Sequence, residues 1–298
     1  METLLSIPPA APDRAIDGPD AAGPADALGR EQRLAGWLRD RGSVLIGYSG
    51  GVDSTYLACI ALDTLGRDRV LAVIGRSASY PEEQWRVARA VADRWALPVL
   101  EIDTDELADP HYAANPTNRC YFCKGHLWDR LVPIARARGL AAVLDGTNAD
   151  DLSDHRPGAV AARERGVQSP LALLGFTKAE IRTRSRALGL PTSGQPSSPC
   201  LSSRLPYGTP VTPERLRRVE RAERALRMLG VTGDLRVRDH DDLARVELPA
   251  GGLQQWLVAP ARDRLAAAVR DAGYAHVAID LGGFRSGSLN VLAGVRDG

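Results

Sequence analysis

The stretch GYSGGVDSTYLACIAL at residues 47–62 constrains the fold of this chain more than any other segment. The apolar run SVLIGYS at residues 43–49 predicts a buried strand that leads into it, and the pattern of residues 53–65 predicts a helix that begins at once. Glycine lets the backbone approach a ligand closely and adopt positive φ. Successive N–H groups at a helix start form a concave anion site, so this turn is predicted to bind phosphate.

Polar side chains in the turn define the phosphate site further. Ser49 and Ser54 add hydroxyl donors beside Gly50 and Gly51. The turn is not a Walker A loop, since it contains no Gly-Lys-Ser/Thr. Asp53 would repel phosphate unless a divalent cation lay between them, so the sequence predicts Mg²⁺ here. The alternative is an ordinary glycine-rich turn with Asp53 as a first-turn acid, and it is disfavoured by the full SGGxDS pattern.

The SGGxDS pattern between an apolar strand and a helix resembles the PP-loop of the ATP pyrophosphatase superfamily. The resemblance implies that ATP is cleaved between its α and β phosphates. It also implies that a carboxylate or carbonyl oxygen of the substrate becomes adenylated, and that a nucleophile then displaces AMP.

Strands and helices are predicted to alternate through the first part of the chain, which implies an α/β fold with a parallel sheet covered on both faces. Ligands in such folds lie beyond the carboxyl ends of the strands. Both GYSGGVDS and DGTNADD leave strands at that edge, so one crevice can use both. The predicted strands are 43–49, 70–75, 98–102 and 141–146, and the predicted helices are 53–65, 82–96 and 121–138.

The Pro-, Ser- and Gly-rich segment at residues 195–214 predicts a loop and a domain boundary. We therefore expect a disordered Pro/Ala-rich tail at 1–28, a PP-loop domain of the adenine nucleotide alpha hydrolase type at 29–205, and a smaller α+β domain at 206–298. In the smaller domain the predicted helices are 212–229 and 260–272, and the predicted strands are 235–240, 243–249 and 275–281, the first two joined by a tight turn at Asp241-Asp242.

Composition narrows the classes of partner. The 38 basic and 37 acidic side chains give a formal net charge of +1, so no nucleic-acid partner is expected. No apolar run approaches the roughly 20 residues that span a bilayer, so no membrane partner is expected. Four cysteines are too few for a secreted disulfide scaffold, which indicates a reducing compartment and a cytoplasmic location.

The segment DGTNADDLSDHRPG at residues 145–158 is a second polar cluster at a strand end. Gly146 and Thr147 are predicted to line the nucleotide crevice. Asp150 or Asp151 is a candidate ligand of Mg²⁺, and the alternative is that these acids cap a helix N-terminus.

Three of the four cysteines are candidates for sulfur or metal chemistry. Cys120 and Cys123 form the C-x-x-C of RCYFCK, and Cys200 lies in the loop that should border the same crevice. Cys59 is predicted to pack in the core, because it lies among apolar residues of the helix after the turn. Arg204 follows Cys200 by four residues and is predicted to stabilise a thiolate or a phosphate, the alternative being an ordinary surface arginine.

The residues alone leave the role of the three thiols open. Structural zinc needs a fourth ligand, which only His111 or His126 would supply. A Cys120–Cys123 redox pair is a second interpretation. An iron–sulfur cluster held by three thiolates, with one iron left open, is a third.

Five segments together resemble the LarE family of ATP-dependent sulfur transferases, which make the nickel-pincer nucleotide cofactor. The resemblance covers about residues 30–295, in SGGVDS, NPTNRCYFCK, DGTNADDLSDHRPG, SPCLSSRLPYG and LGGFRSGSLN. It implies that ATP and Mg²⁺ adenylate a carboxylate of pyridinium-3,5-biscarboxylic acid mononucleotide, and that sulfur then replaces AMP to give the thiocarboxylate. It also implies a homo-oligomer such as a hexamer, and transient contact with other enzymes of the pathway.

Two sulfur sources occur in that family. Some members sacrifice the sulfur of a cysteine that matches Cys200, which becomes dehydroalanine. Others hold a 4Fe-4S cluster on three cysteines, and its free iron carries a transferable sulfide. Cys120, Cys123 and Cys200 match the second type, so sulfur carried by the cluster is favoured over sacrifice of Cys200.

The smaller domain is expected to bind the substrate phosphate. Arg236, Arg238 and Arg245 alternate along two predicted strands and so can share one face, and arginine binds phosphate through two hydrogen bonds. The resemblance implies that acids in matching stretches bind metal or phosphate at a subunit interface, which selects Glu223 and Glu247 together with Arg236. The alternative for each is a solvated surface charge.

Three other functions are alternatives to a sulfur transferase. A tRNA-thiolating enzyme also combines a PP-loop with three cysteines, but the balanced charge disfavours it. An amidating ligase would leave the cysteines unexplained. A non-enzymatic nucleotide sensor is the remaining alternative.

Overall fold

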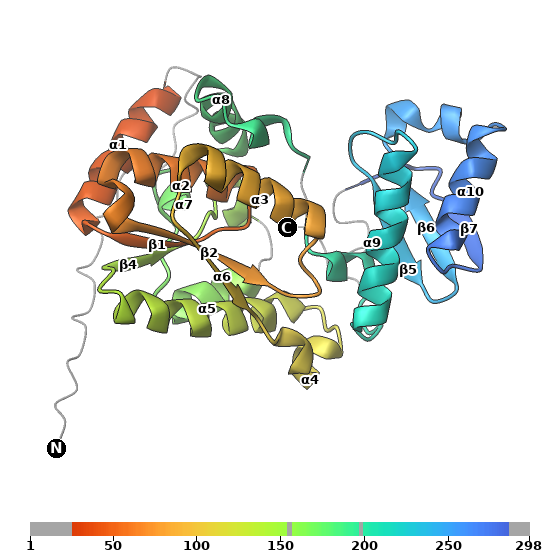
Figure 1. Ribbon diagram of the computed structural model, residues 1–298, viewed down its shortest axis with the longest axis horizontal. Helices are drawn as coiled ribbons and strands as arrows, with labels where there is room; N and C mark the ends of the chain where they lie inside the picture. The colour runs from red at the N-terminus through yellow and green to blue at the C-terminus, as the bar shows by residue number, and fades with distance from the viewer. Residues whose placement is uncertain (1–25, 154–156, 197–198, 286–298) are drawn as a thin grey trace.

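A computed structural model describes residues 26–153, 157–196 and 199–285 (Figure 1). Most of the predicted tail, and the SGSLN part of the terminal LGGFRSGSLN motif, lie outside the described residues.

The larger sheet has four parallel strands in the order β3-β2-β1-β4. They are β1 (Val44–Gly47), β2 (Val70–Arg76), β3 (Val99–Asp103) and β4 (Ala142–Leu144). The chain builds outward from β1 to β3 and then places β4 on the other side of β1, so the winding direction reverses between β1 and β4. A crevice for ligands forms at this point in such sheets. The predicted α/β class with a parallel sheet is confirmed.

Alternate side chains of β1 point to opposite faces of the sheet and enter two separate cores. Val44 and Ile46 belong to the larger core, together with apolar side chains of α1 (Asp26–Arg41), α2 (Val52–Leu65) and α3 (Glu82–Trp95). These helices cover one face of the sheet, as Figure 1 shows.

The other face is covered by α5 (Arg119–Ala137) and α6 (Pro157–Glu164). Leu45 of β1 packs there with Trp128 and Leu131 of α5, and all three are fully buried. The sheet therefore lies between two helical layers, and its carboxyl edge is left for the site.

Helix α1 was not assigned from the sequence, and residues 26–28 form its start rather than the end of a tail. Its buried Leu34 and Leu38 join the larger core, where Ile181 of α8 (Lys178–Ala187) also packs. Helix α8 thus lies on the same side of the sheet as the helix that follows the glycine-rich turn.

The second sheet has three strands in the order β5-β6-β7. Strands β5 (Arg236–His240) and β6 (Leu243–Glu247) are antiparallel, and β7 (His276–Ile279) runs parallel to β6. Helices α9 (Pro213–Met228) and α10 (Ala261–Asp271) pack on this sheet around its own apolar core, so the predicted smaller α+β unit is confirmed.

Short helices connect these elements. The α-helical ones are α4 (Pro110–Ala113) and α7 (Pro170–Leu173), and the 3-10 helices are η1 (Arg67–Arg69), η2 (Glu106–Ala108), η3 (Ala149–Ser153), η4 (Pro191–Gly194), η5 (Leu201–Arg204), η6 (Ala250–Gly252) and η7 (Gln254–Trp256).

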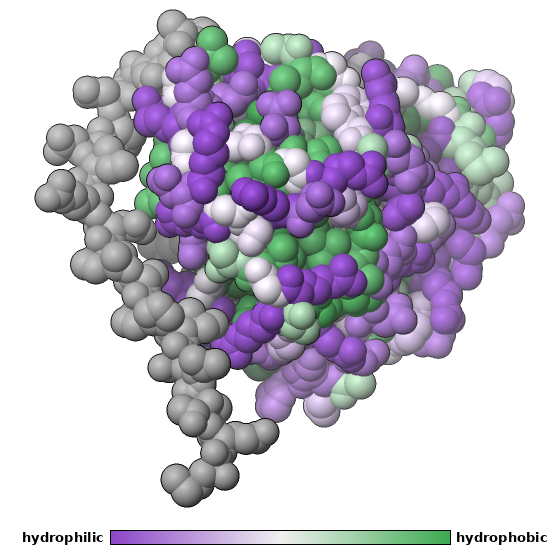
Figure 2. All heavy atoms as spheres, turned by 60° about the vertical axis from the view of Figure 1, so that its left-hand side comes forward, coloured by the Kyte–Doolittle hydropathy of each residue, from purple (hydrophilic) through white to green (hydrophobic). Residues whose placement is uncertain are grey.

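Hydrophilic residues cover most of the face seen in Figure 2, and hydrophobic residues show between them near its centre. Among the described residues, none of the helices combines the length and the apolar character needed to span a bilayer.

Candidate active site

The glycine-rich turn follows β1 directly and opens α2. Gly51 is the N-cap of α2 and makes no side-chain cap hydrogen bond. The first N–H groups of a helix have no partner within it, so those after Gly51 are available to an anion. Gly50 has φ of 68°, and a Cβ built on it would lie 2.6 Å from the Cβ of Ala88 in α3. Only glycine fits this position, because the turn is pressed against α3.

Two serine hydroxyls face each other across the turn. The Oγ atoms of Ser49 and Ser54 lie 3.1 Å apart, and the N–H of Ser49 donates to Ser54 Oγ over 3.2 Å. Ser54 is buried and Ser49 is exposed. The predicted hydroxyl donors therefore lie at one end of α2, with Ser49 on the open side.

Asp53 lies in the first turn of α2 and has two unlike carboxylate oxygens. Oδ2 accepts a hydrogen bond from the ammonium of Lys178, the first residue of α8. Oδ1 is buried and has no hydrogen-bond partner among the described residues. An unpartnered carboxylate oxygen beside a phosphate-binding turn is a suitable ligand for Mg²⁺, so this position fits the predicted ion.

The loop after β4 packs against the same turn. A Cβ on Gly146 would lie 2.9 Å from the backbone N of Ser54, so a larger residue would push the two loops apart. Thr147 is held by Asp145, which accepts hydrogen bonds from its N–H at 3.1 Å and its hydroxyl at 3.0 Å. The two loops therefore lie against each other at the carboxyl edge of the sheet, and their use as one nucleotide crevice stays a prediction.

The two acids that follow are engaged with backbone groups. Asp151 accepts a hydrogen bond from the N–H of Asn148 at 3.1 Å, and Asp150 accepts one from the N–H of Lys178 at 2.8 Å. These contacts correspond to the capping alternative of the sequence analysis. Asp150 also ties the start of α8 to this loop.

Residues 79–84 connect the glycine-rich turn to the Cys200 segment. The carbonyl of Ser49 accepts hydrogen bonds from the hydroxyl of Tyr80 at 2.8 Å and from Nε2 of Gln84 at 3.0 Å. At the other end, the carbonyl of Ser79 accepts one from the N–H of Leu201 at 2.8 Å. The phosphate-binding turn and Cys200 are therefore joined through a single short segment.

Three buried hydroxyls form hydrogen bonds that hold the Cys200 segment in place. Tyr112 Oη lies 2.5 Å from Ser79 Oγ and 2.6 Å from Ser202 Oγ, and the two serine oxygens are 3.0 Å apart. The triangle joins α4, the loop after β2 and η5. It restrains the backbone next to Cys200.

The three predicted thiols lie in one neighbourhood: Cys120 and Cys123 are one turn apart at the start of α5, and Cys123 packs against the cluster that contains Leu201, the residue after Cys200. Burial raises the pKa of Cys123, and negative charge on Glu106, Cys200 and Cys120 raises it further. Burial likewise raises the pKa of Tyr112, and Cys200 and Cys123 add to the effect. Cys120 is exposed and the other two thiols are partly buried, so the group is reached from the surface.

Arg119 is a positive charge beside these thiols that the sequence analysis missed. It is 4% exposed, and it donates a hydrogen bond to Asn115 Oδ1. Burial acts to lower its pKa, but Cys200 and Cys120 outweigh burial and raise it. Its position directly before Cys120 was the available signal. A guanidinium here offsets negative charge that gathers at this group.

The described residues do not include three His, Cys, Asp or Glu side chains arranged to bind one metal ion. His111 and His126, the possible fourth zinc ligands, both contact the carboxylate of Asp109, at 3.1 and 3.0 Å. Three thiols in one neighbourhood match the donor set of an iron–sulfur cluster in kind. Cys59 lies apart in the core, as predicted, and burial raises its pKa to about 12.

Arg204 is a buried structural arginine rather than a surface one. It is 2% exposed and binds Glu223 of α9 through two hydrogen bonds of 2.9 Å each. Its third nitrogen donates to the carbonyls of Pro199 at 2.5 Å and Cys200 at 2.9 Å. Arg204 therefore fastens the Cys200 segment to the smaller sheet unit.

The charges predicted on β5 and β6 are also buried, so the surface-charge alternative is wrong for them. Arg236 is 3% exposed and Glu247 is fully buried. Arg238 donates to Glu247 at 2.7 Å and to the carbonyl of Ser203 at 2.8 Å. Burial, with Arg204 and Arg238 nearby, lowers the pKa of Arg236 to about 10. Positive charges thus gather next to the Cys200 segment, and both predicted acidic metal ligands are paired with arginines.

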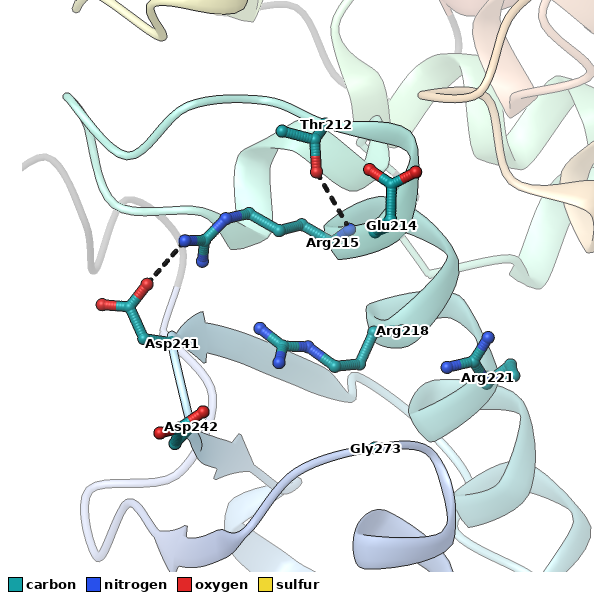
Figure 3. A pocket seen from close by; sticks show the side chains of 8 residues that line it. All are labelled: Thr212, Glu214, Arg215, Arg218, Arg221, Asp241, Asp242 and Gly273. Carbon is teal, nitrogen blue, oxygen red and sulfur yellow. Dashed lines mark hydrogen bonds and ion pairs between the residues drawn. The ribbon is translucent and has the colours of Figure 1, made fainter.

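A separate open hollow of about 430 Å³ lies along α9 and the β5–β6 turn (Figure 3). Arg215 and Arg218 point across it toward the turn, where both bind the fully buried carboxylate of Asp239, and Arg215 also binds Asp241. This hollow is lined neither by residues of the glycine-rich turn nor by the cysteines. Its arginines hold the hairpin in place, and the candidate site remains the crevice between the turn and the thiols.

Comparison with known proteins agrees with this geometry. The sequence profile of the NAD synthase family matches residues 36–131. The uncharacterized protein slr1717 of Synechocystis sp. is 48% identical over 246 residues, which cover 83% of this chain and 91% of that protein. The pyridinium-3,5-bisthiocarboxylic acid mononucleotide synthase of Lactiplantibacillus plantarum is 38% identical over 261 residues, which cover 88% of this chain and 94% of that enzyme.

A shorter match is found with an NAD(+) synthetase. The glutamine-dependent NAD(+) synthetase of Aquifex aeolicus is 34% identical over 76 residues, or 25% of this chain and 13% of that enzyme. The first two relatives therefore match over most of this chain, whereas the NAD(+) synthetase matches over a short segment. The chain belongs to the LarE-like family of PP-loop ATP pyrophosphatases.

Proposed function

We propose that this enzyme is an ATP-dependent sulfur transferase that converts a carboxylate of pyridinium-3,5-biscarboxylic acid mononucleotide into a thiocarboxylate. The observation that carries the proposal is the connection from the PP-loop through residues 79–84 to Cys200 and its two neighbouring thiols. The 38% identity to a synthase of the bisthiocarboxylic acid mononucleotide supports it.

Adenylation is assigned to the PP-loop end of the crevice. The free N–H groups at the start of α2 bind the ATP phosphates, and Oδ1 of Asp53 would bind Mg²⁺, which neutralises charge on those phosphates. A substrate carboxylate oxygen attacks the α-phosphorus, and pyrophosphate leaves. Arg236 and Arg238 bind the phosphate of the mononucleotide and so point its ring toward the PP-loop.

Sulfur transfer is assigned to the thiol end. Cys120, Cys123 and Cys200 would hold a 4Fe-4S cluster, which when bound supplies sulfide on the iron that lacks a protein ligand. Arg119 is a buried positive charge beside these thiols, and it would offset negative charge on a cluster bound there. Arg204 and the hydroxyls of Tyr112 and Ser202 hold the backbone of Cys200 in place.

A second sulfur source has an observation in its favour. The Cys200 side chain is partly exposed and follows a segment that is joined to the PP-loop, so sacrifice of its sulfur is the competing mechanism. In it the thiolate of Cys200 attacks the adenylated carbonyl carbon and AMP leaves. Loss of the Cα proton of Cys200 then breaks its Cβ–S bond, which frees the thiocarboxylate and leaves dehydroalanine.

We also propose a domain organisation, an oligomeric state and a location for this protein. A PP-loop domain spans residues 29–205 and a substrate-phosphate and oligomerisation domain spans residues 206–298. The chain assembles as a cytoplasmic homo-oligomer, and Glu223 and Glu247 lie near the contact between copies.

Anaerobic purification followed by iron, sulfide and visible-absorption measurements tests the sulfur source. Iron and sulfide bound in cluster stoichiometry support the cluster. A colourless, iron-free protein in which Cys200 loses the elements of H₂S during turnover supports sacrifice.

Pyrophosphate release that depends on the pyridinium mononucleotide, without a tRNA gel shift, supports the proposed substrate. A tRNA shift with no such release overturns it.

A further inference from the structure

We propose that Lys178 is a movable counterion: it neutralises Asp53 in the empty site and transfers to the leaving β- and γ-phosphates when ATP binds with its divalent cation. This rests on the proposed function, because it assigns a residue to the adenylation half of that reaction. Among the described residues, Lys178 is the side chain that binds the Asp53 carboxylate.

The two carboxylate oxygens of Asp53 have different surroundings. Oδ2 holds the ammonium of Lys178, and Oδ1 is buried and unpartnered among the described residues. The Lys178 side chain is 36% exposed and that of Asp53 is 18% exposed. The pair is therefore reachable from the crevice, and the ammonium can leave without unfolding its surroundings.

The backbone of Lys178 is fixed while its side chain is long and flexible. Its N–H donates to Asp150, and Thr177 and Glu180 form a capping box at the same helix start. Arg30 of α1 further holds Glu180 at 2.9 Å. Movement is thus confined to the four-carbon stem, which carries a single point charge.

Lysine is exceptional in this chain. Of 38 basic residues, only Lys124 and Lys178 are lysines. Three other carboxylates are each held by one arginine through two hydrogen bonds: Arg204 holds Glu223, Arg184 holds Glu31, and Arg165 holds Asp129. An arginine at position 178 would occupy both oxygens of Asp53 in the same way and leave none for a metal ion.

Charge balance explains why an exchange is needed. In the empty site the ammonium cancels the carboxylate, so a second cation at Asp53 would meet a like charge at short range. Bound ATP brings several negative charges to the same turn. Lys178 then has phosphate oxygens to bind, and Asp53 becomes free for the cation. Metal and nucleotide consequently bind together rather than in sequence.

A fixed salt bridge that merely positions Asp53 is the competing explanation, and two substitutions separate it from exchange. Lys178→Met removes the counterion. Lys178→Arg keeps the positive charge but can bind both oxygens of Asp53 through two hydrogen bonds. Arg186→Met is the matched control, because Arg186 is an exposed cation of the same helix whose guanidinium donates to Thr183 and not to Asp53.

Binding of Mn²⁺, used as a spectroscopic substitute for Mg²⁺, is measured first without nucleotide and then with a non-hydrolysable α,β-methylene ATP. Exchange predicts that Lys178→Met binds Mn²⁺ without nucleotide about tenfold more tightly than the unmodified protein, since a competing cation is gone. It also predicts that the nucleotide enhances Mn²⁺ binding less in this variant. Unchanged or weaker Mn²⁺ binding in Lys178→Met overturns the proposal.

Pyrophosphate release is the second measurement. Exchange predicts that Lys178→Met and Lys178→Arg both release pyrophosphate about 100-fold more slowly, whereas a fixed salt bridge predicts rescue by Lys178→Arg. If Lys178→Met does not fold, Lys178→Arg decides alone, and full activity in it overturns the proposal. If the unmodified protein releases no pyrophosphate with the pyridinium mononucleotide, the proposed function fails, while the Mn²⁺ experiment still decides the exchange.

Discussion

The guanidinium of Arg204 binds the carboxylate of Glu223 through two parallel hydrogen bonds of 2.9 Å. The same guanidinium holds the carbonyl of Cys200, and Glu223 accepts the N–H of Val237 at the start of β5 at 3.0 Å. One ion pair therefore couples the proposed sulfur-bearing segment to the smaller sheet unit. Its strength sets how firmly Cys200 is held.

Removing one partner of this pair leaves the other charge buried. We expect Glu223→Gln to reduce the free energy of unfolding by about 3–5 kcal/mol, measured by urea unfolding. The double variant Arg204→Met/Glu223→Gln should recover part of this loss, since no unpaired charge remains. Equal losses in the single and double variants would contradict the role of the buried charge.

The same pair gives a dependence of stability on pH. Burial acts to raise the pKa of Glu223, but Arg204 outweighs burial and lowers it. A carboxyl with a lowered pKa in the folded state stabilises the fold at pH above its unfolded pKa, and this stability is lost as pH falls through the folded pKa. We expect the unmodified protein to lose more free energy of unfolding between about pH 7 and pH 3 than the double variant.

Asp53 is expected to be essential for adenylation. Asp53→Ala removes both the proposed Mg²⁺ ligand Oδ1 and the partner of Lys178, so pyrophosphate release should fall by about 100-fold or more. Asp63→Ala is the control, because Asp63 is an exposed acid in the same helix. Unimpaired pyrophosphate release in Asp53→Ala, measured by a coupled phosphate assay, would remove the metal argument.

Much of the fold was readable from local patterns. The apolar residues of β1 and β2 indicated buried strands, and the Gly50-Gly51 turn indicated where the first strand gives way to a helix. These features depend on neighbours a few residues apart. Helix α1 was missed, because its buried Leu34 and Leu38 stand in a mostly polar segment that follows a Pro/Ala-rich stretch.

The site was predictable only where a motif carried it. Lys178 was missed because its partner Asp53 lies 125 residues away in the sequence. The residues around the lysine, FTKAE, form no motif that would predict this contact. Arg236 and Glu247 were selected from the sequence as candidate site residues, and a surface role was left open for them. Their burial follows from the β5–β6 register, which sets Arg236 opposite Glu247, and from the segment after Cys200, where the Ser203 carbonyl accepts from Arg238 beside Glu247. Such long-range pairings are properties of the folded chain.

Two glycines are expected to respond to alanine in opposite ways. Gly50→Ala meets both a φ of 68° and a Cβ only 2.6 Å from that of Ala88, so it should destabilise the fold by at least about 1 kcal/mol and weaken nucleotide binding. Gly36 lies inside α1 with nothing within 4 Å of a built Cβ, so Gly36→Ala should stabilise by about 0.5–1 kcal/mol. Thermal unfolding of both variants checks the pair. A Gly50→Ala protein as stable as the unmodified one would contradict the close approach of the turn to α3.

Substitution of single cysteines separates the two sulfur sources. Cys120→Ala should still release pyrophosphate, because the thiols lie outside the PP-loop, but with a cluster it should transfer no sulfur. Under the sacrificial mechanism Cys120→Ala transfers one sulfur per chain, and the mass of the chain falls by the elements of H₂S. Cys200→Ala should abolish transfer in either case. Cys59→Ala is the control, since Cys59 is buried in the larger core away from the site. Product thiocarboxylate measured by mass spectrometry, with the mass of the intact protein, distinguishes these outcomes, and undiminished repeated transfer by Cys120→Ala would rule the cluster out.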